Sequence, residues 1–264
     1  MKRPILLTIF SLFCLTPYGF AGARHIMVIA HRGESIHYPA NTLPAYRGAI
    51  KLGVDYFETD VRTTADGKLI IMHNKDVDAT TNGHGLVRDM VLAQIRKLDA
   101  GVKFGPQFRG TKVPTFDEVL RLAEGRVGVY VDCKDIAAPA LVAAIDRHHM
   151  ENHVVIYGYS IAFMKEVHRL RPRIKVMPET VSTEIIRREI EELQPRVFAF
   201  SSFDFNDAII AIAKQAKADI YVDRLGAADN PASWQNAIDR GATGIQTNRP
   251  AQLLQYLRSH GYHQ

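Results

Sequence analysis

The fold is decided by the stretch Val54–His73, which reads VDYFETDVRTTADGKLIIMH. Two apolar runs rich in β-forming residues flank Asp66-Gly67, and this dipeptide is a strong signal for a hairpin turn. If the loop has two residues, residues whose numbers sum to 133 face each other, and Asp60 lies opposite His73. Glu58 shares the face of Asp60, because side chains alternate along a strand. Two carboxylates and an imidazole therefore converge, which is typical of a functional site.

The rest of the chain repeats a strand followed by an amphipathic helix. Further strands are predicted at 26–30, 127–131, 153–157, 174–177, 197–200, 220–222 and 244–246. Helices are predicted after Asn41 or Thr42 and at 91–98, 115–123, 139–148, 161–170, 184–193, 206–216, 234–240 and 252–259. With both hairpin arms this makes nine strands, close to the eight of a barrel. No phosphate-loop or dinucleotide glycine motif follows a predicted strand, so we predict an α/β fold of the (β/α)8 TIM-barrel type rather than a doubly wound sheet.

Residues 1–23 are predicted to be a cleaved signal peptide. Lys2 and Arg3 form a basic start, residues 5–15 are apolar, and Ala21-Gly22-Ala23 fits a small-residue cleavage site. The mature chain, 24–264, is then expected to be a single domain that is exported, either periplasmic or secreted. An uncleaved membrane anchor is the alternative, but the apolar run is short for a membrane span, so no stable anchor is expected after cleavage.

The composition is that of a globular protein with a small anionic partner. Of the 264 residues, 47% are hydrophobic and 23% are charged. Removal of Lys2 and Arg3 lowers the formal charge from +5 to +3, because residues 1–23 hold no acidic residue. No basic stripe interleaved with aromatic residues is present, so nucleic-acid binding is not predicted. Cleavage would leave Cys133 as the one cysteine, which excludes an intramolecular disulfide, and no pattern indicates an oligomeric state.

The longest irregular stretch spans residues 74–114. It is rich in Gly and Asp and holds one predicted helix, before the capping box Thr115-Phe116-Asp117-Glu118 opens the next helix. Its length and its position after the hairpin predict a small insertion over the site.

Polar residues follow several predicted strands at the point where each strand ends. Each lies in phase with apolar residues expected to fill the barrel: His31 with Ile29, His73 with Ile71, and Asp132 and Lys134 with Tyr130. Active sites of such barrels lie at the carboxyl ends of the strands. We therefore expect these side chains to meet at one rim, together with Arg32, Glu58 and Asp60.

The three carboxylates, Glu58, Asp60 and Asp132, indicate a divalent cation. Carboxylates that share one inward face repel each other, and burying them unpaired is costly. Hard oxygen ligands favour Ca²⁺ or Mg²⁺ over zinc. A zinc site would use the histidines as ligands, but closely spaced ligand pairs are missing. The alternative for Lys134 and Asp132 is a surface ion pair of little energetic value.

A cation, two basic residues and two histidines at one rim predict phosphoryl chemistry. The cation, Arg32 and Lys134 would neutralise the phosphate oxygens. Of His31 and His73, one would take a proton from the attacking hydroxyl, and the other would protonate the leaving alkoxide, which is a poor leaving group at neutral pH.

These motifs resemble the glycerophosphodiester phosphodiesterase family over nearly all of the mature chain. Its pattern of His-Arg, Glu-x-Asp and His is matched by His31-Arg32, Glu58-Thr59-Asp60 and His73, and further matches are Pro39–Leu43, Thr80–Gly83, Val113–Thr115 and Gly244–Pro250. The resemblance implies a phospholipase-C-like barrel that hydrolyses glycerophosphodiesters to glycerol phosphate and an alcohol. It also implies His31 and His73 as the acid–base pair and Glu58 and Asp60 as metal ligands, with Asp132 where the family usually has Glu.

The chain departs from the family pattern at Ala40, where Glu is usual, and at Asn74, where Asp is common. Two other functions remain open. One is a phosphodiesterase acting on intact phospholipid or phosphoinositide, which would favour an exposed apolar rim. The other is a non-catalytic exported binding protein for a phosphorylated ligand. Weaker candidates for substrate contacts follow later strands, namely Glu179, Asp204 and Asp223.

Overall fold

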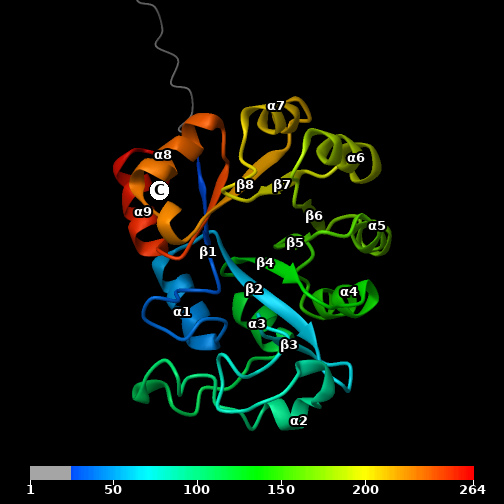
Figure 1. Ribbon diagram of the computed structural model, residues 1–264, viewed down its shortest axis with the longest axis vertical. Helices are drawn as coiled ribbons and strands as arrows, with labels where there is room; N and C mark the ends of the chain where they lie inside the picture. Colours follow the sequence, from blue (N-terminus) through cyan, green and yellow to red (C-terminus); the bar gives the residue numbers. More distant parts are fainter. Residues whose placement is uncertain (1–24) are drawn as a thin grey trace, which may run out of the picture.

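The computed structural model describes residues 25–264, which form a barrel of parallel strands inside a ring of helices (Figure 1). The strands are β1 (Met27–Ala30), β2 (Tyr56–Thr63), β3 (Leu69–Ile71), β4 (Gly128–Cys133), β5 (Val154–Gly158), β6 (Lys175–Pro178), β7 (Val197–Phe200), β8 (Asp219–Arg224) and β9 (Gly244–Thr247). The α-helices are α1 (Leu43–Leu52), α2 (Leu92–Ile95), α3 (Phe116–Ala123), α4 (Ala138–Arg147), α5 (Ile161–Leu170), α6 (Thr183–Leu193), α7 (Asp207–Gln215), α8 (Pro231–Arg240) and α9 (Pro250–Ser259). The predicted signal peptide, 1–23, lies outside the described residues.

The sheet runs in the order β6-β5-β4-β2-β1-β9-β8-β7, and the pairs along this path are parallel. The two outer strands meet where the Thr180 N–H donates to the Ala199 carbonyl at 3.1 Å, which nearly closes the ring. Within this order the first strand, β1, pairs with the last, β9. The predicted (β/α)8 TIM barrel is confirmed, and β3 is an added antiparallel strand on β2.

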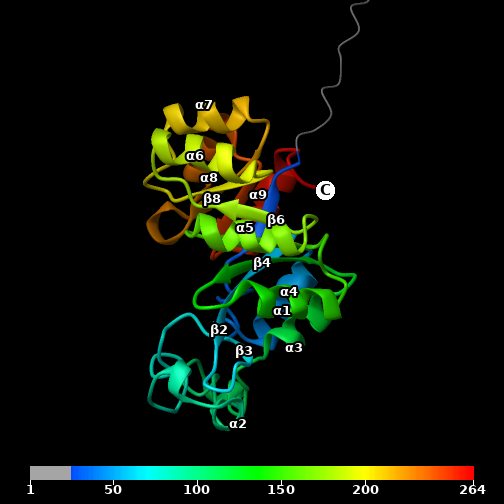
Figure 2. The ribbon, with the colours of Figure 1, turned by 90° about the vertical axis from the view of Figure 1, so that its right-hand side faces the viewer.

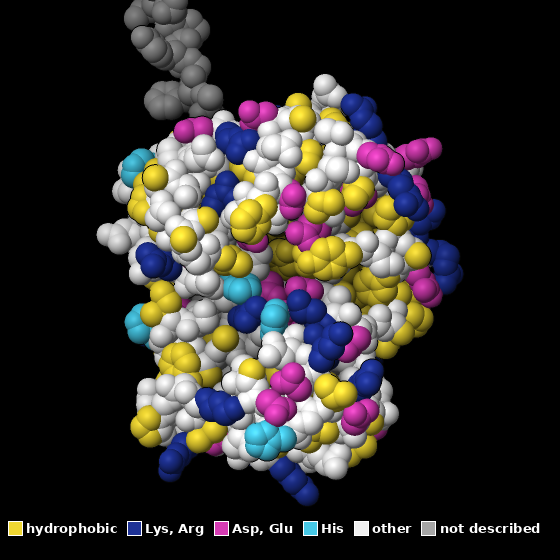
Figure 3. All heavy atoms as spheres, viewed as in Figure 1, with side chains coloured by type: hydrophobic (Ala, Val, Ile, Leu, Met, Phe, Trp, Pro, Cys, Tyr) yellow, Lys and Arg dark blue, Asp and Glu magenta, His cyan; other side chains and the backbone are white. Residues whose placement is uncertain are grey.

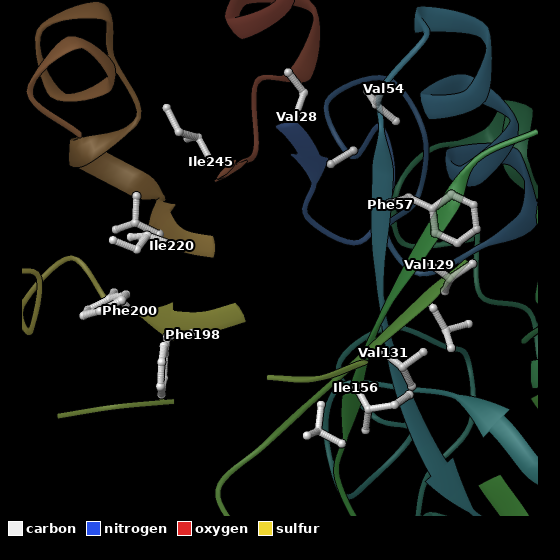
Figure 4. Packing of buried hydrophobic residues seen from close by; sticks show 14 of the residues in the cluster. Val28, Val54, Phe57, Val129, Val131, Ile156, Phe198, Phe200, Ile220 and Ile245 are labelled. Atoms are coloured by element: carbon white, nitrogen blue, oxygen red, sulfur yellow. The ribbon is translucent and has the colours of Figure 1, made fainter. Parts of the chain in front are cut away.

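Two apolar layers hold the barrel together. The inner cluster comprises Ile29, Tyr130, Val155, Tyr157, Met177, Val197, Ala199 and Tyr221. An outer cluster joins the strands to the helices, and Figure 4 shows its members Phe57, Val129, Val131 and Ile156 on β2, β4 and β5. The inner positions of Ile29 and Tyr130 confirm the phase predicted for His31 and Asp132. Ile71 belongs to the outer cluster, so the prediction that the residues before His73 fill the barrel is wrong.

The β2–β3 hairpin is displaced by one residue from the predicted register. Its loop has three residues, because the Thr64 N–H donates to the Lys68 carbonyl at 2.9 Å and Gly67 adopts a left-handed φ of 71°. The Met72 N–H consequently donates to the Asp60 carbonyl at 2.9 Å. The predicted pairing of Asp60 with His73 is therefore wrong, since a one-residue shift moves every side chain to the opposite face.

The segment between β3 and α3 packs around a small core of its own. The buried members of this core are Ile70, Met72, Val77, Val87, Ile95, Ala100 and Val113. Figures 1 and 2 show the segment beside the barrel, beyond β3. Its predicted role as a cover over the site stays a prediction. The capping box predicted at the start of α3 is confirmed, with Thr115 and Glu118 bonding each other's backbone N–H groups at 2.9 and 3.2 Å.

Candidate active site

Three carboxylates gather at the carboxyl ends of β2 and β4. Asp60 and Asp132 are partners in the parallel register of these strands, and Glu58 lies on the same face of β2. One oxygen of each lies within 4.8 Å of the others. Glu58 is 2% exposed and Asp60 is 1% exposed. The predicted ligand set is therefore assembled in a space that can hold a cation.

Arg32 and Lys134 contact this cluster from two sides. The Arg32 backbone N–H donates to Glu58 Oε2 at 2.8 Å. Its side-chain Nε lies 3.4 Å from Asp60 Oδ2 and has no hydrogen-bond partner among residues 25–264. Lys134 Nζ donates to Asp132 Oδ2 at 2.6 Å and lies 3.1 Å from Asp60 Oδ1. The cluster thus holds three carboxylates and two cationic side chains. With all five groups ionised, the cluster has a net charge of −1. A divalent cation would change this to +1, which complements the single negative charge of a phosphodiester.

Burial and mutual repulsion set the ionisation of these groups. Burial, followed by the charge of Asp60, raises the pKa of Glu58 well above its usual range, and burial also raises the pKa of Asp132. Burial opposes ionisation of Asp60, but the charges of Lys134 and Arg32 outweigh it and lower the pKa. Burial opposes the charge of Lys134, and the neighbouring Asp132 and Asp60 nevertheless raise its pKa. The raised pKa values of two carboxyls indicate a place that favours another positive charge.

Asn41 holds Asp60 in position. Its amide Nδ2 donates to Asp60 Oδ2 at 2.7 Å, and its Oδ1 accepts from the Tyr46 hydroxyl at 2.9 Å. The same hydroxyl lies 2.7 Å from Thr59 Oγ1. Asn41 has a left-handed φ of 60°, a conformation that Asn tolerates better than most residues. The sequence presents Asn41 as a candidate helix cap and as part of the motif Pro39–Leu43, and neither indicated its contact with the carboxylate.

His31 is oriented by the far end of the chain. Its Nδ1 donates to Asn248 Oδ1 at 2.7 Å, the Asn248 N–H donates to Asp229 Oδ2 at 2.7 Å, and Asp229 Oδ1 accepts from Trp234 Nε1 at 3.0 Å. His31 Nε2 is left facing Glu58 Oε2 at 4.0 Å. Burial, and then the charge of Arg32, lower the pKa of His31 to about 4, which keeps the imidazole neutral near pH 7. Asn248 was missed, and its one signal is its place in the closing motif Gly244–Pro250.

His73 is held by its backbone and by its neighbour. Its Nδ1 donates to Asn74 Oδ1 at 2.9 Å, and its carbonyl accepts from Arg62 Nη2 at 2.7 Å and Nε at 3.2 Å. Arg62 Nη1 also donates to Asp135 Oδ2 at 2.9 Å. The charge of His73 contributes to the pKa values of His31, Asp60 and Asp132, so His73 lies close to these groups. The sequence analysis did not single out Arg62. The one signal that could have indicated it is an arginine within the strand predicted before Asp66-Gly67.

A recess lined by tyrosines and carboxylates adjoins the cluster inside the barrel mouth. Its lining includes Tyr130, Tyr157, Glu179, Tyr221 and Asp223. The Tyr157 hydroxyl donates to the Glu179 carboxylate. Burial, and then the charges of Asp132 and of carboxylates including Glu179, raise the pKa of Tyr130, so the recess and the cluster share one electrostatic environment. Figure 3 shows histidine, basic and acidic side chains gathered around the central hollow of this face.

The weaker candidates divide between the recess and the loops. Glu179 and Asp223 line the recess, as a substrate contact requires. Asp204 instead accepts from Ser201 Oγ at 2.5 Å, a contact within the loop after β7. Cys133 packs with the outer apolar cluster, as its opposite phase to Asp132 requires.

Comparison with known proteins identifies relatives over most of the chain. A family model described as "Glycerophosphoryl diester phosphodiesterase family" matches residues 31–252. A glycerophosphodiester phosphodiesterase of Caldanaerobacter subterraneus is 31% identical over 242 residues, which cover 89% of this chain and 99% of the relative.

Solved structures share the architecture. The crystal structure of a glycerophosphodiester phosphodiesterase from Agrobacterium tumefaciens has a TM-score of 0.75 and 27% identity, and the match covers 86% of this chain and 97% of that one. An Oleispira antarctica phosphodiesterase in complex with the product sn-glycerol-3-phosphate has a TM-score of 0.78 over 88% of this chain and 96% of that one; at 21% identity, this likeness supports the fold. The chain therefore belongs to the glycerophosphoryl diester phosphodiesterase family, whose members are phosphoric diester hydrolases.

Proposed function

We propose that this protein hydrolyses glycerophosphodiesters to glycerol phosphate and an alcohol with the help of one divalent cation, Ca²⁺ or Mg²⁺. The observation that carries the proposal is the meeting of three carboxylates, two basic side chains and two oriented histidines at one barrel rim. Membership of the family supports the substrate class, and the product complex of the Oleispira protein supports glycerol phosphate as a product.

The cation would be held by oxygens of Glu58, Asp60 and Asp132. These residues fit a hard cation, because they offer oxygen ligands that lie within 4.8 Å of one another and outnumber the basic groups beside them. When bound, the cation would neutralise charge on the phosphate oxygens. Arg32 and Lys134 would add positive charge at the same phosphate and favour the charge that develops during displacement.

His31 and His73 would move the protons. Each imidazole has its Nδ1 on an amide oxygen, so each keeps Nε2 for proton exchange with the substrate. One Nε2 takes the proton of the attacking hydroxyl, that of water or of the glycerol, as that oxygen bonds to phosphorus; if the glycerol attacks, water then opens the cyclic phosphate to glycerol phosphate. The other imidazole, in its protonated form, gives its proton to the alkoxide as the bond between phosphorus and the leaving oxygen breaks.

Product analysis tests this proposal with a panel of soluble glycerophosphodiesters. His31→Ala and His73→Ala should each lower kcat by about 10²-fold or more, since general acid–base catalysis contributes 10² to 10⁴. His84→Ala, in an exposed surface pair, is the matched control. EDTA should abolish turnover, and Ca²⁺ or Mg²⁺ should restore it. Near-normal turnover by both active-site variants would refute the roles of the histidines, and no turnover by the wild type would favour the binding-protein alternative.

A rim of exposed apolar side chains favours intact phospholipid as a second candidate substrate. Tyr159, Val181 and Phe203 follow β5, β6 and β7 and are 76%, 45% and 97% exposed. Such side chains can enter a lipid surface. If lipid is the substrate, Phe203→Ser should slow hydrolysis of phospholipid vesicles and leave hydrolysis of a soluble diester unchanged. Equal rates of Phe203→Ser and wild type on vesicles would exclude this role of the rim.

Export remains part of the proposal, and its test is the amino-terminal sequence of the protein recovered from the periplasm and the medium. A start at residue 24 is expected. Within residues 25–264, the longest helices are too short and too polar to cross a bilayer.

A further inference from the structure

A second group of metal-binding side chains lies at the opposite end of the barrel. His25 precedes β1, Asp55 precedes β2, and His263 follows α9. The C-terminal segment reaches this end because the Ile26 N–H donates to the Tyr262 carbonyl at 2.9 Å. One ligand atom of each residue lies within 4.8 Å of the other two. These residues stand at the amino ends of the strands, whereas the catalytic cluster stands at the carboxyl ends.

Both imidazoles point their Nε2 atoms at the same carboxylate. His25 Nε2 lies 2.9 Å from Asp55 Oδ1, and His263 Nε2 lies 3.1 Å from Asp55 Oδ2. The two ring centroids are 4.5 Å apart. The His263 side chain is 7% exposed, whereas that of His25 is 40% exposed. The cluster therefore has a buried half and a half that solvent can reach.

The hydrogen bonds around His263 leave a place for a proton or a metal ion between it and Asp55. Its Nδ1 lies 2.9 Å from the Gln264 oxygen, which can only accept, so Nδ1 carries the proton. In the neutral ring, Nε2 then presents a lone pair to Asp55 Oδ2. That oxygen already accepts the Val28 N–H at 2.7 Å and has no proton to donate. A proton or a metal ion must therefore lie between the two atoms.

We propose that His25, Asp55 and His263 form a Zn²⁺ site, with water as the fourth ligand. Two imidazole nitrogens and one carboxylate oxygen are a common zinc ligand set, and imidazole favours zinc over Ca²⁺ and Mg²⁺. Ligands about 2.0–2.1 Å from a tetrahedral zinc ion are about 3.3 Å apart. The imidazole nitrogens lie 2.9 and 3.1 Å from the two Asp55 oxygens, near this value, and one ligand atom of each residue lies within 4.8 Å of the other two.

The zinc site would link the segment before β1 to the segment after α9. His25 leads into the first strand, and His263 follows the last helix, so a shared ion ties both segments to the start of β2. Metal-bound histidines usually donate their other ring N–H to an acceptor outside the metal site, and the Gln264 oxygen is such an acceptor for His263 Nδ1. The ion binds the folded arrangement and not the unfolded chain, so zinc should raise Tm.

The test is calorimetric titration of Zn²⁺ into tag-free protein that starts at residue 24, with excess Mg²⁺ present to occupy the catalytic carboxylates. His25→Ala and His263→Ala should each weaken zinc binding at least about ten-fold, in line with the loss expected for parts of a metal site. Asp60→Asn and His84→Ala are the controls and should bind zinc as the wild type does. His84 forms a surface pair with Asp78 at 2.8 Å, and within residues 25–264 it belongs to no group of three possible metal ligands.

Thermal unfolding supplies a second measurement. Zinc at about 100 times its wild-type Kd should raise Tm of the wild type by about 5 °C or more, and should raise Tm of His25→Ala by no more than about half as much. His25 is the more exposed ligand, so this variant decides the question if His263→Ala does not fold. Zinc binding of wild-type strength by His25→Ala, or no binding by the wild type, would overturn the proposal.

Discussion

Glu189→Gln should change how the stability of this protein depends on pH. Glu189 lies on α6 and is 3% exposed. Its Oε2 and the nearby Thr180 Oγ1 both lack a hydrogen-bond partner within residues 25–264. Burial, and further the charge of Glu179, raise the pKa of Glu189 from 4.5 to about 8 in the folded protein. The carboxyl is therefore neutral in the fold under conditions in which it is ionised in the unfolded chain.

Proton binding determines whether stability rises or falls with pH. Between pH 4.5 and 8 the folded state holds a proton that the unfolded state has released, so stability falls as pH rises through this range. At about 1.4 kcal/mol per pKa unit, the loss between pH 5 and pH 8 is about 3 kcal/mol. Gln is neutral at every pH and lacks this dependence. Any fixed cost of burying its amide is the same at both pH values and cancels in the comparison.

The assay is urea unfolding of wild type and Glu189→Gln at pH 5 and pH 8, with EDTA present. The free energy of unfolding of the variant, relative to the wild type, should increase by about 3 kcal/mol from pH 5 to pH 8. Glu191→Gln, at an exposed position of the same helix, is the control and should show no such change. An identical difference between Glu189→Gln and wild type at both pH values would refute the reasoning.

Three further changes test the active site. Asn248→Ala should lower kcat about ten-fold with little change in KM, because His31 loses the partner of its Nδ1, and an unchanged kcat in initial-rate assays would contradict this. Lys134→Met should lower kcat/KM about 100-fold, because a charge beside the phosphate is lost. The surface variant Lys68→Met is the control. A loss for Lys134→Met smaller than that for Lys68→Met would exclude a role of Lys134 at the phosphate. Tyr46→Phe should reduce the free energy of unfolding by about 1–3 kcal/mol, since Asn41 loses a buried donor, and urea unfolding measures it.

The barrel and most of its elements could be predicted because their signals are local. Phase along each strand placed Ile29 and Tyr130 inside, and helix patterns such as that of α5 agree with the structure at both ends, Ile161 and Leu170. The hairpin register could not be predicted from Asp66-Gly67 alone. Asp66 Oδ1 accepts the Leu92 N–H at 2.9 Å, so a distant segment helps to select the longer loop.

The candidate site was predicted as a set of residues but not as an arrangement. Strand ends and phase were sufficient to bring Glu58, Asp60 and Asp132 together. The positioning contacts were not accessible in this way, because they join residues far apart in the chain. Asn248 and His31 are separated by 217 positions and meet only through the pairing of β9 with β1.

That pairing makes the function of this protein an all-or-none property of its synthesis. A chain that stops before β9 leaves one edge of β1 unpaired and His31 without its partner, although it already contains the carboxylates and both histidines. Such a chain holds nearly every chemical group of the site and still lacks the geometry. We therefore expect a chain that lacks β9 to lack an assembled site, although it already contains these groups.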